Sequence, residues 1–218
     1  MKNQRKRKPP TGHTRFSPKR QNRLARHVAA LPLLFLALAA TTLLASCTSA
    51  ANHEVALQEK KDAIMATIEE ETNAFFARDY DRWKATYIQE DYAFQAWSNR
   101  DGTFDSSVGW DAIDNSVGLY IHENPIPEAD QATTVERKNI RFKFYGDDVA
   151  YLTWDQFNSD RDGALFFHSK EVRLLERVGS EWKIVCVSAF WDFQNLIPAE
   201  RLPEIQRMDK ESRGTDKI

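Results

Sequence analysis

The sequence predicts an α+β fold in which helices come first and a mostly antiparallel sheet follows. Three observations predict it. Apolar residues recur at helical spacing from Leu57 onward. After Pro127 the apolar period changes to two residues, which is the repeat of a strand. Short turn sequences, Gly146-Asp147 and Gly179-Ser180, then separate the apolar segments, as expected for an antiparallel meander.

Three helices are expected before the meander. Their apolar faces carry, in chain order, Leu57, Ile64, Ile68 and Phe75; then Tyr80, Trp83 and Tyr87; then Ile113, Val117 and Ile121. Asp79 is expected to be the N-cap of the second helix and Ser107 that of the third, because such side chains accept hydrogen bonds from unpaired amides. Pro125 and Pro127 are expected to end the third helix.

Five strands complete the expected fold. One, from Tyr92 to Ser98, lies between the second and third helices. Four more follow the third helix, near residues 140–144, 149–157, 165–176 and 182–191. The segment beyond Pro198 is polar and is expected to fray.

The N-terminus has the pattern of a bacterial lipoprotein signal. Ten of the 30 Lys and Arg residues precede Cys47, and none of the 32 Asp and Glu residues do. An apolar run from Val28 to Leu44 follows, and it ends in Leu44-Ala45-Ser46-Cys47, which resembles a lipobox. We therefore expect cleavage before Cys47 and a protein of the bacterial cell envelope, held on the extracytoplasmic side of a membrane by a lipid on Cys47. The alternatives are an uncleaved signal anchor and a soluble protein cut nearby.

Four segments follow from this interpretation. They are a signal peptide (1–46), a lipidated linker (47–56), a folded domain (57–195) and a polar C-terminal tail (196–218). The mature chain carries 20 basic and 32 acidic residues, so it repels phosphate backbones and no nucleic-acid partner is expected. With Cys47 lipidated, Cys186 has no disulfide partner, and five scattered histidines give no zinc-ligand spacing. Neither a metal nor a cofactor is therefore expected.

Four local motifs, together with the element order, resemble a known superfamily. They span residues 75–83, 109–113 and 145–151, and the fourth combines 171–176 with 182–185. The resemblance is to the nuclear-transport-factor-2-like superfamily, which includes SnoaL-like proteins and ketosteroid isomerase. It implies a cone-shaped roll over residues 57–193, with three helices covering one face of a curved sheet and enclosing a pocket. It leaves function open, because enzymes, binding modules and assembly domains share this fold.

The turns also give an expected register for the sheet. A two-residue turn at Gly179-Ser180 sets Glu171 opposite Ser188, and a loop centred near Arg161 sets Glu171 opposite Tyr151. Because side chains alternate between faces, one face gathers polar residues and is the candidate pocket face. Its expected residues are Tyr151, Asp155, Glu171, Arg173, Cys186, Ser188 and Phe190, walled by Trp97, Trp110 and Tyr120.

Three functions remain open at this stage. The leading one is a lipoprotein that binds an unknown small molecule in this pocket, without catalysis or with an unassigned activity. The second is an isomerase, cyclase or hydrolase that uses Asp155 or Glu171 as general base, although Arg173 beside Glu171 would favour the charged carboxylate and weaken that role. The third is a structural or partner-binding lipoprotein. An open cavity favours the first two functions, and a filled core favours the third.

The second face of the sheet is expected to be apolar. It would carry Leu152, Trp154, Val172, Leu174, Val185 and Val187. Because the helices cover only one face, we expect a homodimer through this patch, as the resemblance also implies. The alternative is that residues 195–205 fold back over it.

Overall fold

The structure is a computed structural model that describes the backbone of residues 31–127 and 134–212, and the side chains of 52–127 and 134–207. The chain divides into two compact units, Met1–Val55 and Ala56–Ile218. Among the residues described, no helix is long and apolar enough to cross a membrane. The side chain of Cys47 lies outside the described side chains, so its lipidation stays a prediction.

Helix α1 (Leu31–Ala77) begins in the first unit and continues into the second. The linker expected over 47–56 therefore lies within this helix. Helix α2 (Tyr80–Ala85) begins as predicted, because the Asp79 carboxylate accepts a hydrogen bond of 3.2 Å from the backbone amide of Arg82.

The predicted third helix is made of three short pieces. They are α3 (Trp110–Ile113), the π-helical turn η1 (Asp114–Gly118) and α4 (Leu119–Glu123). Its N-cap is Gly109, and the prediction of Ser107 as N-cap was wrong. Ser107 lies in a strand and pairs with Gln95 of the preceding strand.

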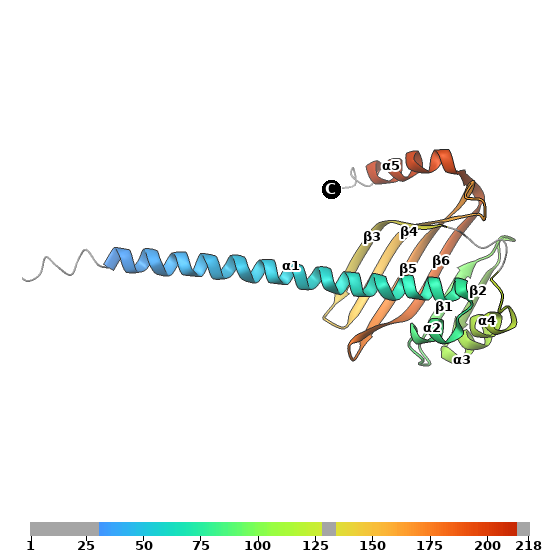
Figure 1. Ribbon diagram of the computed structural model, residues 1–218, viewed down its shortest axis with the longest axis horizontal. Coiled ribbons are helices and arrows are strands. Elements are labelled where there is room, and N and C mark those ends of the chain that lie inside the picture. The colour runs from blue at the N-terminus through green and yellow to red at the C-terminus, as the bar shows by residue number, and fades with distance from the viewer. Residues whose placement is uncertain (1–30, 128–133, 213–218) are drawn as a thin grey trace, which may run out of the picture. The chain divides into compact units, whose positions relative to one another are not determined.

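Six strands form one sheet. They are β1 (Phe94–Ser98), β2 (Phe104–Val108), β3 (Val135–Tyr145), β4 (Val149–Ser159), β5 (Leu165–Val178) and β6 (Glu181–Pro198). Their order is β2-β1-β6-β5-β4-β3, with β1 parallel to β6 and all other neighbours antiparallel (Figure 1). The predicted α+β class and mostly antiparallel sheet are confirmed, and β2 is an addition that the sequence did not predict.

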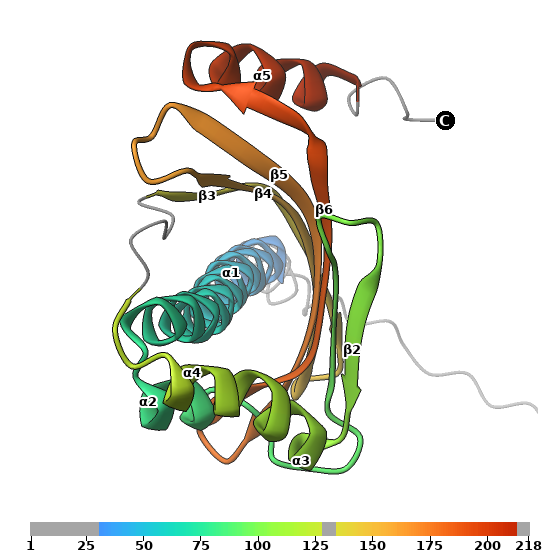
Figure 2. The same ribbon diagram turned by 90° about the vertical axis from the view of Figure 1, so that its right-hand side faces the viewer.

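The sheet curls around the helices of the second unit. Figure 2 shows the part of α1 from Ala56 onward within the concave side, with α2, α3 and α4 across one end. The helical stripes predicted from the sequence face the core, since Ile64, Ile68, Ile113 and Ile121 are all at most 1% exposed. They pack with Trp83, Leu152, Leu175 and Ile184 in the main hydrophobic cluster.

The C-terminal segment is ordered into structure rather than frayed. Strand β6 runs to Pro198, a 3₁₀ turn follows (Ala199–Arg201), and α5 spans Leu202–Ser212 at the other end of the strands from α2 (Figure 2). Ile197 and Leu202 are buried against Phe157 and Phe166. The expectation that the segment beyond Pro198 frays was therefore wrong. Phe157 and Phe166 are not residues of the predicted dimer patch, so the segment does not fold back over that patch.

The predicted register was wrong on both sides of β5. Glu171 pairs with Trp154 on β4 and with Ala189 on β6, instead of Tyr151 and Ser188. The β4–β5 loop is centred later than expected, and a bulge between Leu174 and Leu175 shifts the β5–β6 pairing by one residue. Both errors are odd numbers of residues, so each exchanges the two faces of a neighbouring strand.

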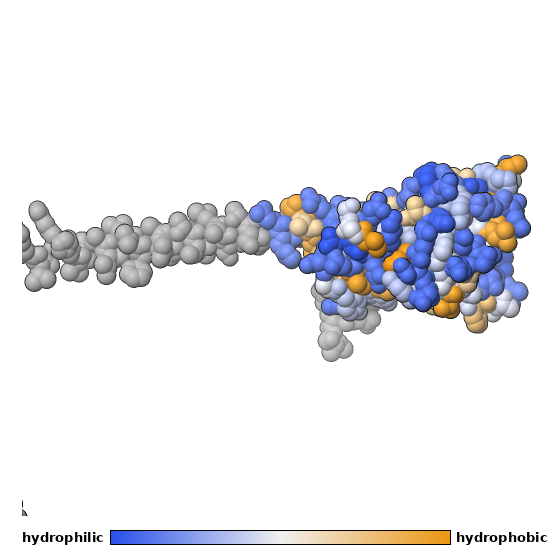
Figure 3. Space-filling model, turned by 90° about the horizontal axis from the view of Figure 1, so that it is seen from below, coloured by the Kyte–Doolittle hydropathy of each residue, from blue (hydrophilic) through white to orange (hydrophobic). Residues whose placement is uncertain are grey.

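This exchange overturns the residues of the predicted dimer patch. Leu152, Trp154, Val185 and Val187 are buried in the core. The face of the sheet away from α1 instead carries Tyr151, Val172, Leu174 and Phe190, of which Phe190 is 62% exposed. On the view in Figure 3, hydrophilic residues predominate and apolar ones are scattered among them. The oligomeric state stays a prediction, now attached to a different set of side chains.

Candidate functional site

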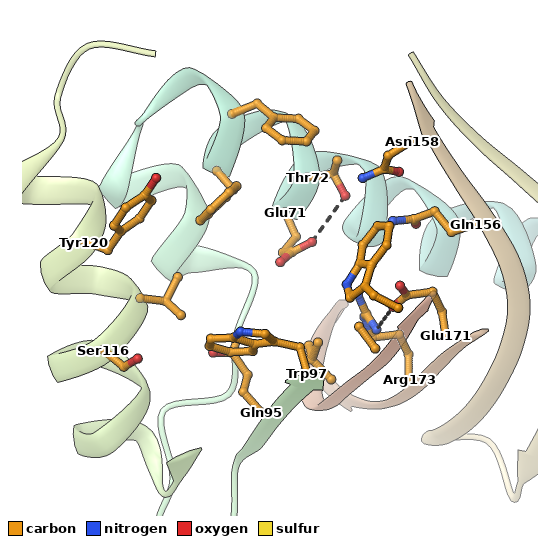
Figure 4. A pocket seen from close by; sticks show the side chains of 16 residues that line it. Glu71, Thr72, Gln95, Trp97, Ser116, Tyr120, Gln156, Asn158, Glu171 and Arg173 are labelled. Atoms are coloured by element: carbon orange, nitrogen blue, oxygen red, sulfur yellow. Dashed lines mark hydrogen bonds and ion pairs between the residues drawn. The ribbon is translucent and has the colours of Figure 1, made fainter. Parts of the chain in front are cut away.

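A cavity of about 580 Å³ lies between α1, the η1–α4 segment and the concave side of the sheet (Figure 4). Its aromatic and apolar walls are Phe75, Phe76, Trp97, Val117, Tyr120, Val187, Ala189 and Trp191. Its polar lining is Glu71, Thr72, Gln95, Ser116, Gln156, Asn158, Glu171 and Arg173. Apolar walls with a few convergent polar groups are typical of small-molecule sites.

The π-helical turn η1 directs side chains of the third helix to this cavity. A π turn adds one residue to a helical turn and so shifts the phase of the side chains that follow. Ser116, Val117 and Tyr120 line the cavity from this segment. The turn is held by Asp114, whose carboxylate accepts a hydrogen bond of 2.7 Å from the Tyr80 hydroxyl. A Cβ on Gly118 would come too close to that carboxylate, so a larger residue there would displace the Asp114 side chain.

Glu171 and Arg173 form a closed ion pair in the sheet wall. Arg173 Nη1 donates to Glu171 Oε2 at 2.7 Å, and Ser169 Oγ donates to Glu171 Oε1 at 2.6 Å. Both charged side chains are buried, and the guanidinium lies 5.1 Å from the ring centre of Trp154. Burial alone would lower the pKa of Arg173, but the charges of Glu171 and Glu71 outweigh it and raise that pKa. Arg173 therefore stays charged, and both oxygens of Glu171 are occupied.

A second polar chain ends at Glu71 on α1. Gln95 Nε2 donates to the Tyr87 hydroxyl at 2.7 Å, and that hydroxyl donates to Glu71 Oε1 at 3.0 Å. Thr72 Oγ1 lies 3.3 Å from Glu71 Oε2 and accepts a hydrogen bond of 2.7 Å from Arg137. Burial, with the Glu71 charge, raises the pKa of Tyr87 well above its usual value, so Tyr87 remains a donor.

Several buried polar atoms at the cavity have no partner. Gln95 is 3% exposed, and its Oε1 accepts no hydrogen bond. Asn158 Oδ1 and Arg173 Nε are likewise buried and unpaired. A buried polar atom without a partner is costly, and a site that a ligand completes is one place where such atoms persist.

Of the residues predicted for the pocket, four line the cavity. They are Trp97, Tyr120, Glu171 and Arg173. Trp110 is instead buried in the core beside Trp83. Tyr151, Asp155, Cys186, Ser188 and Phe190 do not line it, because the register errors assigned them to the wrong face.

Asp155 belongs to a separate cluster on the other face of the sheet. Its buried carboxylate accepts from Asn139 at 2.9 Å, interacts with His168 Nε2 at 3.1 Å and pairs with Lys170. Burial alone would raise the pKa of Asp155, but these hydrogen bonds outweigh burial and hold that pKa well below its usual range. A carboxylate held this firmly in its charged form is a poor general base.

Most of the polar lining of the cavity was not predicted from the sequence. Glu71 had a visible signal, because it lies three residues after Ile68 and four before Phe75, on the apolar stripe of α1. Gln95 lies two residues before Trp97 and so shares its face of β1. Gln156, Asn158 and Trp191 required the correct register. In the described part of the chain, no cluster of three or more metal-ligating residues is present.

No protein-family model and no curated protein sequence matches the chain. Solved structures do match it. A nuclear-transport-factor-2-like protein of unknown function from Shewanella oneidensis has 15% identity and a TM-score of 0.45, and the match covers 60% of this chain and 98% of that one. The fold of this chain is similar to that of nuclear-transport-factor-2-like proteins.

Two further structures give the same picture. A protein from Novosphingobium aromaticivorans, described as a candidate scytalone dehydratase, has 10% identity and a TM-score of 0.49, with 65% of this chain and 88% of that one covered. A nuclear-transport-factor-2-like protein from Salmonella enterica has 16% identity and a TM-score of 0.43, with 61% and 91% covered. At these identities the likeness concerns the fold alone.

Proposed function

We propose that this chain is a lipid-anchored protein of the bacterial cell envelope that binds a small organic molecule in the cavity between α1 and the sheet. The observation that carries the binding function is the cavity itself. Its volume of about 580 Å³ lies within the roughly 300–1,000 Å³ range of ligand pockets. Its aromatic walls supply apolar contacts, and Glu71, Gln156 and Arg173 are among the polar side chains that line it.

The alternative of general-base catalysis has less support. Asp155 does not line the cavity, and the partners of its carboxylate include Asn139, His168 and Lys170. Glu171 lines the cavity, but Arg173 and Ser169 occupy its two oxygens. The ion pairs and hydrogen bonds that already hold these two carboxylates make both of them less available to a substrate proton. A purely structural role is disfavoured by the cavity, since a filled core would serve it better.

A thermal-shift screen tests the binding function. The full chain in detergent is screened against a metabolite library, and every hit is repeated with Val117→Phe, which fills the cavity from the η1 segment. We expect at least one compound to stabilise the wild type and to lose its effect in the filled variant. Hits that stabilise both proteins equally would place binding elsewhere and contradict the proposal. A matched control is Val55→Phe, because Val55 is exposed on α1 and does not line the cavity.

The lipid anchor is tested separately. The support for it is the Leu44-Ala45-Ser46-Cys47 sequence after an apolar run. Growth with a clickable fatty-acid analogue should label the wild type and not Cys47→Ala, whereas Cys186→Ala should label normally. Labelling of the Cys47→Ala variant would show that the sequence is not a lipobox in this chain.

A further inference from the structure

The two carboxylates that line the cavity, Glu71 and Glu171, differ in whether a basic side chain contacts them directly. The Glu171 carboxylate is neutralised directly by Arg173 at 2.7 Å. Glu71, in contrast, has only the hydroxyls of Tyr87 and Thr72 as partners, and within the described residues it forms no ion pair. Figure 4 shows Glu71 projecting from α1 into the middle of the cavity, apart from the Glu171–Arg173 pair.

The nearby arginines influence Glu71 but have other partners. Arg137 is one hydrogen bond away, since it donates to Thr72, and burial lowers its pKa while the Glu71 charge opposes that shift. Arg173 donates to Glu171 and to the backbone carbonyl of Val172. Glu71 is therefore the cavity carboxylate that neither of these arginines contacts directly.

The direction of the hydrogen bonds identifies what Gln95 still needs. A carboxylate can only accept, so the Tyr87 hydroxyl must give its proton to Glu71 and accept from Gln95. That order fixes the Gln95 amide with Nε2 toward Tyr87 and leaves Oε1 as an unpaired acceptor. Gln95 Oε1 is itself buried, so the acceptor that reaches the cavity is the Glu71 carboxylate, and a ligand that pairs with it must carry hydrogen-bond donors.

The walls beside this carboxylate suit an aromatic cation. Phe76, Trp97 and Trp191 line the cavity, and aromatic faces attract organic cations as well as burying apolar groups. We propose that the ligand is an aromatic or apolar amine whose ammonium group pairs with Glu71 and whose apolar part lies against these rings. This inference rests on the proposed binding function and adds the chemical class of the ligand.

Three matched probes test it by calorimetry on the full chain: tryptamine, its neutral alcohol analogue tryptophol, and the anion indole-3-acetate. We expect tryptamine to bind most tightly. Glu71→Gln preserves the shape of the side chain and should weaken tryptamine roughly 10- to 100-fold, because a charge-assisted contact is lost. The same variant should change tryptophol binding by less than about threefold. Glu59→Gln, exposed on the same helix, is the control and should leave all three affinities unchanged.

The results of these experiments distinguish a failure of the proposed ligand class from a failure of the proposed binding function. Tighter binding of indole-3-acetate, equal tryptamine affinity in Glu71→Gln, or no binding of any probe would overturn the amine inference. Trp97→Ala distinguishes the two levels, because it removes a cavity wall that every ligand would contact. If another compound class stabilises the chain and Trp97→Ala abolishes that effect, the binding function stands while the amine inference falls.

Discussion

Removing Arg173 should be among the most damaging single changes to the sheet wall. The Arg173→Met variant deletes the guanidinium that neutralises Glu171, whose side chain is 1% exposed. Loss of one partner from a buried ion pair costs about 3–5 kcal/mol, because the other charge stays buried without compensation. At about 2–4 °C per kcal/mol for a domain of this size, the melting temperature should fall by roughly 6–20 °C.

The companion variants make this prediction specific. Glu171→Leu combined with Arg173→Met should recover most of the loss, because two apolar side chains replace two buried charges. Arg177→Met is the control, since Arg177 pairs with Asp148 at the surface and should cost no more than about 1 kcal/mol. Thermal melts and urea unfolding measure all three. An Arg173→Met protein that melts within about 2 °C of the wild type would refute the reasoning that this pair is enclosed.

Three other predictions follow from the same structure. The pKa of Asp155 is depressed in the folded state. The stabilisation that the Asp155 carboxylate gives to the folded protein is therefore complete above its unfolded pKa of about 3.9, and it is lost as the pH falls through its folded pKa. Asp155→Asn should therefore destabilise at neutral pH, and melts at falling pH should show the difference from wild type shrinking below about pH 4. Asp79→Ala should cost about 1 kcal/mol in urea unfolding, because the N-cap of α2 is lost; an unchanged midpoint would contradict that. Sedimentation should show a homodimer that Phe190→Glu dissociates, and a wild-type monomer at high micromolar concentration would remove this proposal.

Periodicity predicted the elements well where an apolar face is buried. The stripes of α1 and of the third helix face the core, and Asp79 caps α2 as its residue type suggested. Strand β2 was not predicted, because it has no buried apolar face. Phe104 and Val108 at its ends are exposed, and a polar edge strand shows no alternation of apolar and polar residues.

The prediction of which residues line the cavity depended on the strand register, and the sequence does not determine that register to within one residue. A hairpin register read from a turn holds only until the first bulge, and the bulge at Leu174/Leu175 is three residues from the β5–β6 turn. That one shift replaced Val187, Ala189 and Trp191 with their outward-facing neighbours in the predicted pocket. Glu171 and Arg173 were placed on a common face correctly, because they belong to one strand and need no pairing to share a face.

Glu71 shows where closer inspection of the sequence would have succeeded. A charged residue at helical spacing within an apolar stripe has to be buried beside the core or face a cavity. In this chain it faces the cavity, together with Thr72 and Phe75 from the same part of α1. Glu71, on which the proposed ligand class rests, could therefore be predicted from the sequence. The opposing wall of the cavity, formed by β4 and β6, could not.

The most direct test of the binding cavity is fluorine NMR of the chain labelled with fluorotryptophan. Of the six tryptophans, Trp97 and Trp191 line the cavity, while Trp182 is buried near the β5–β6 turn. Titration of a compound that stabilises the protein should shift the Trp97 and Trp191 signals and leave Trp182 unchanged. A shift of Trp182 without Trp97 and Trp191 would contradict ligand binding in this cavity.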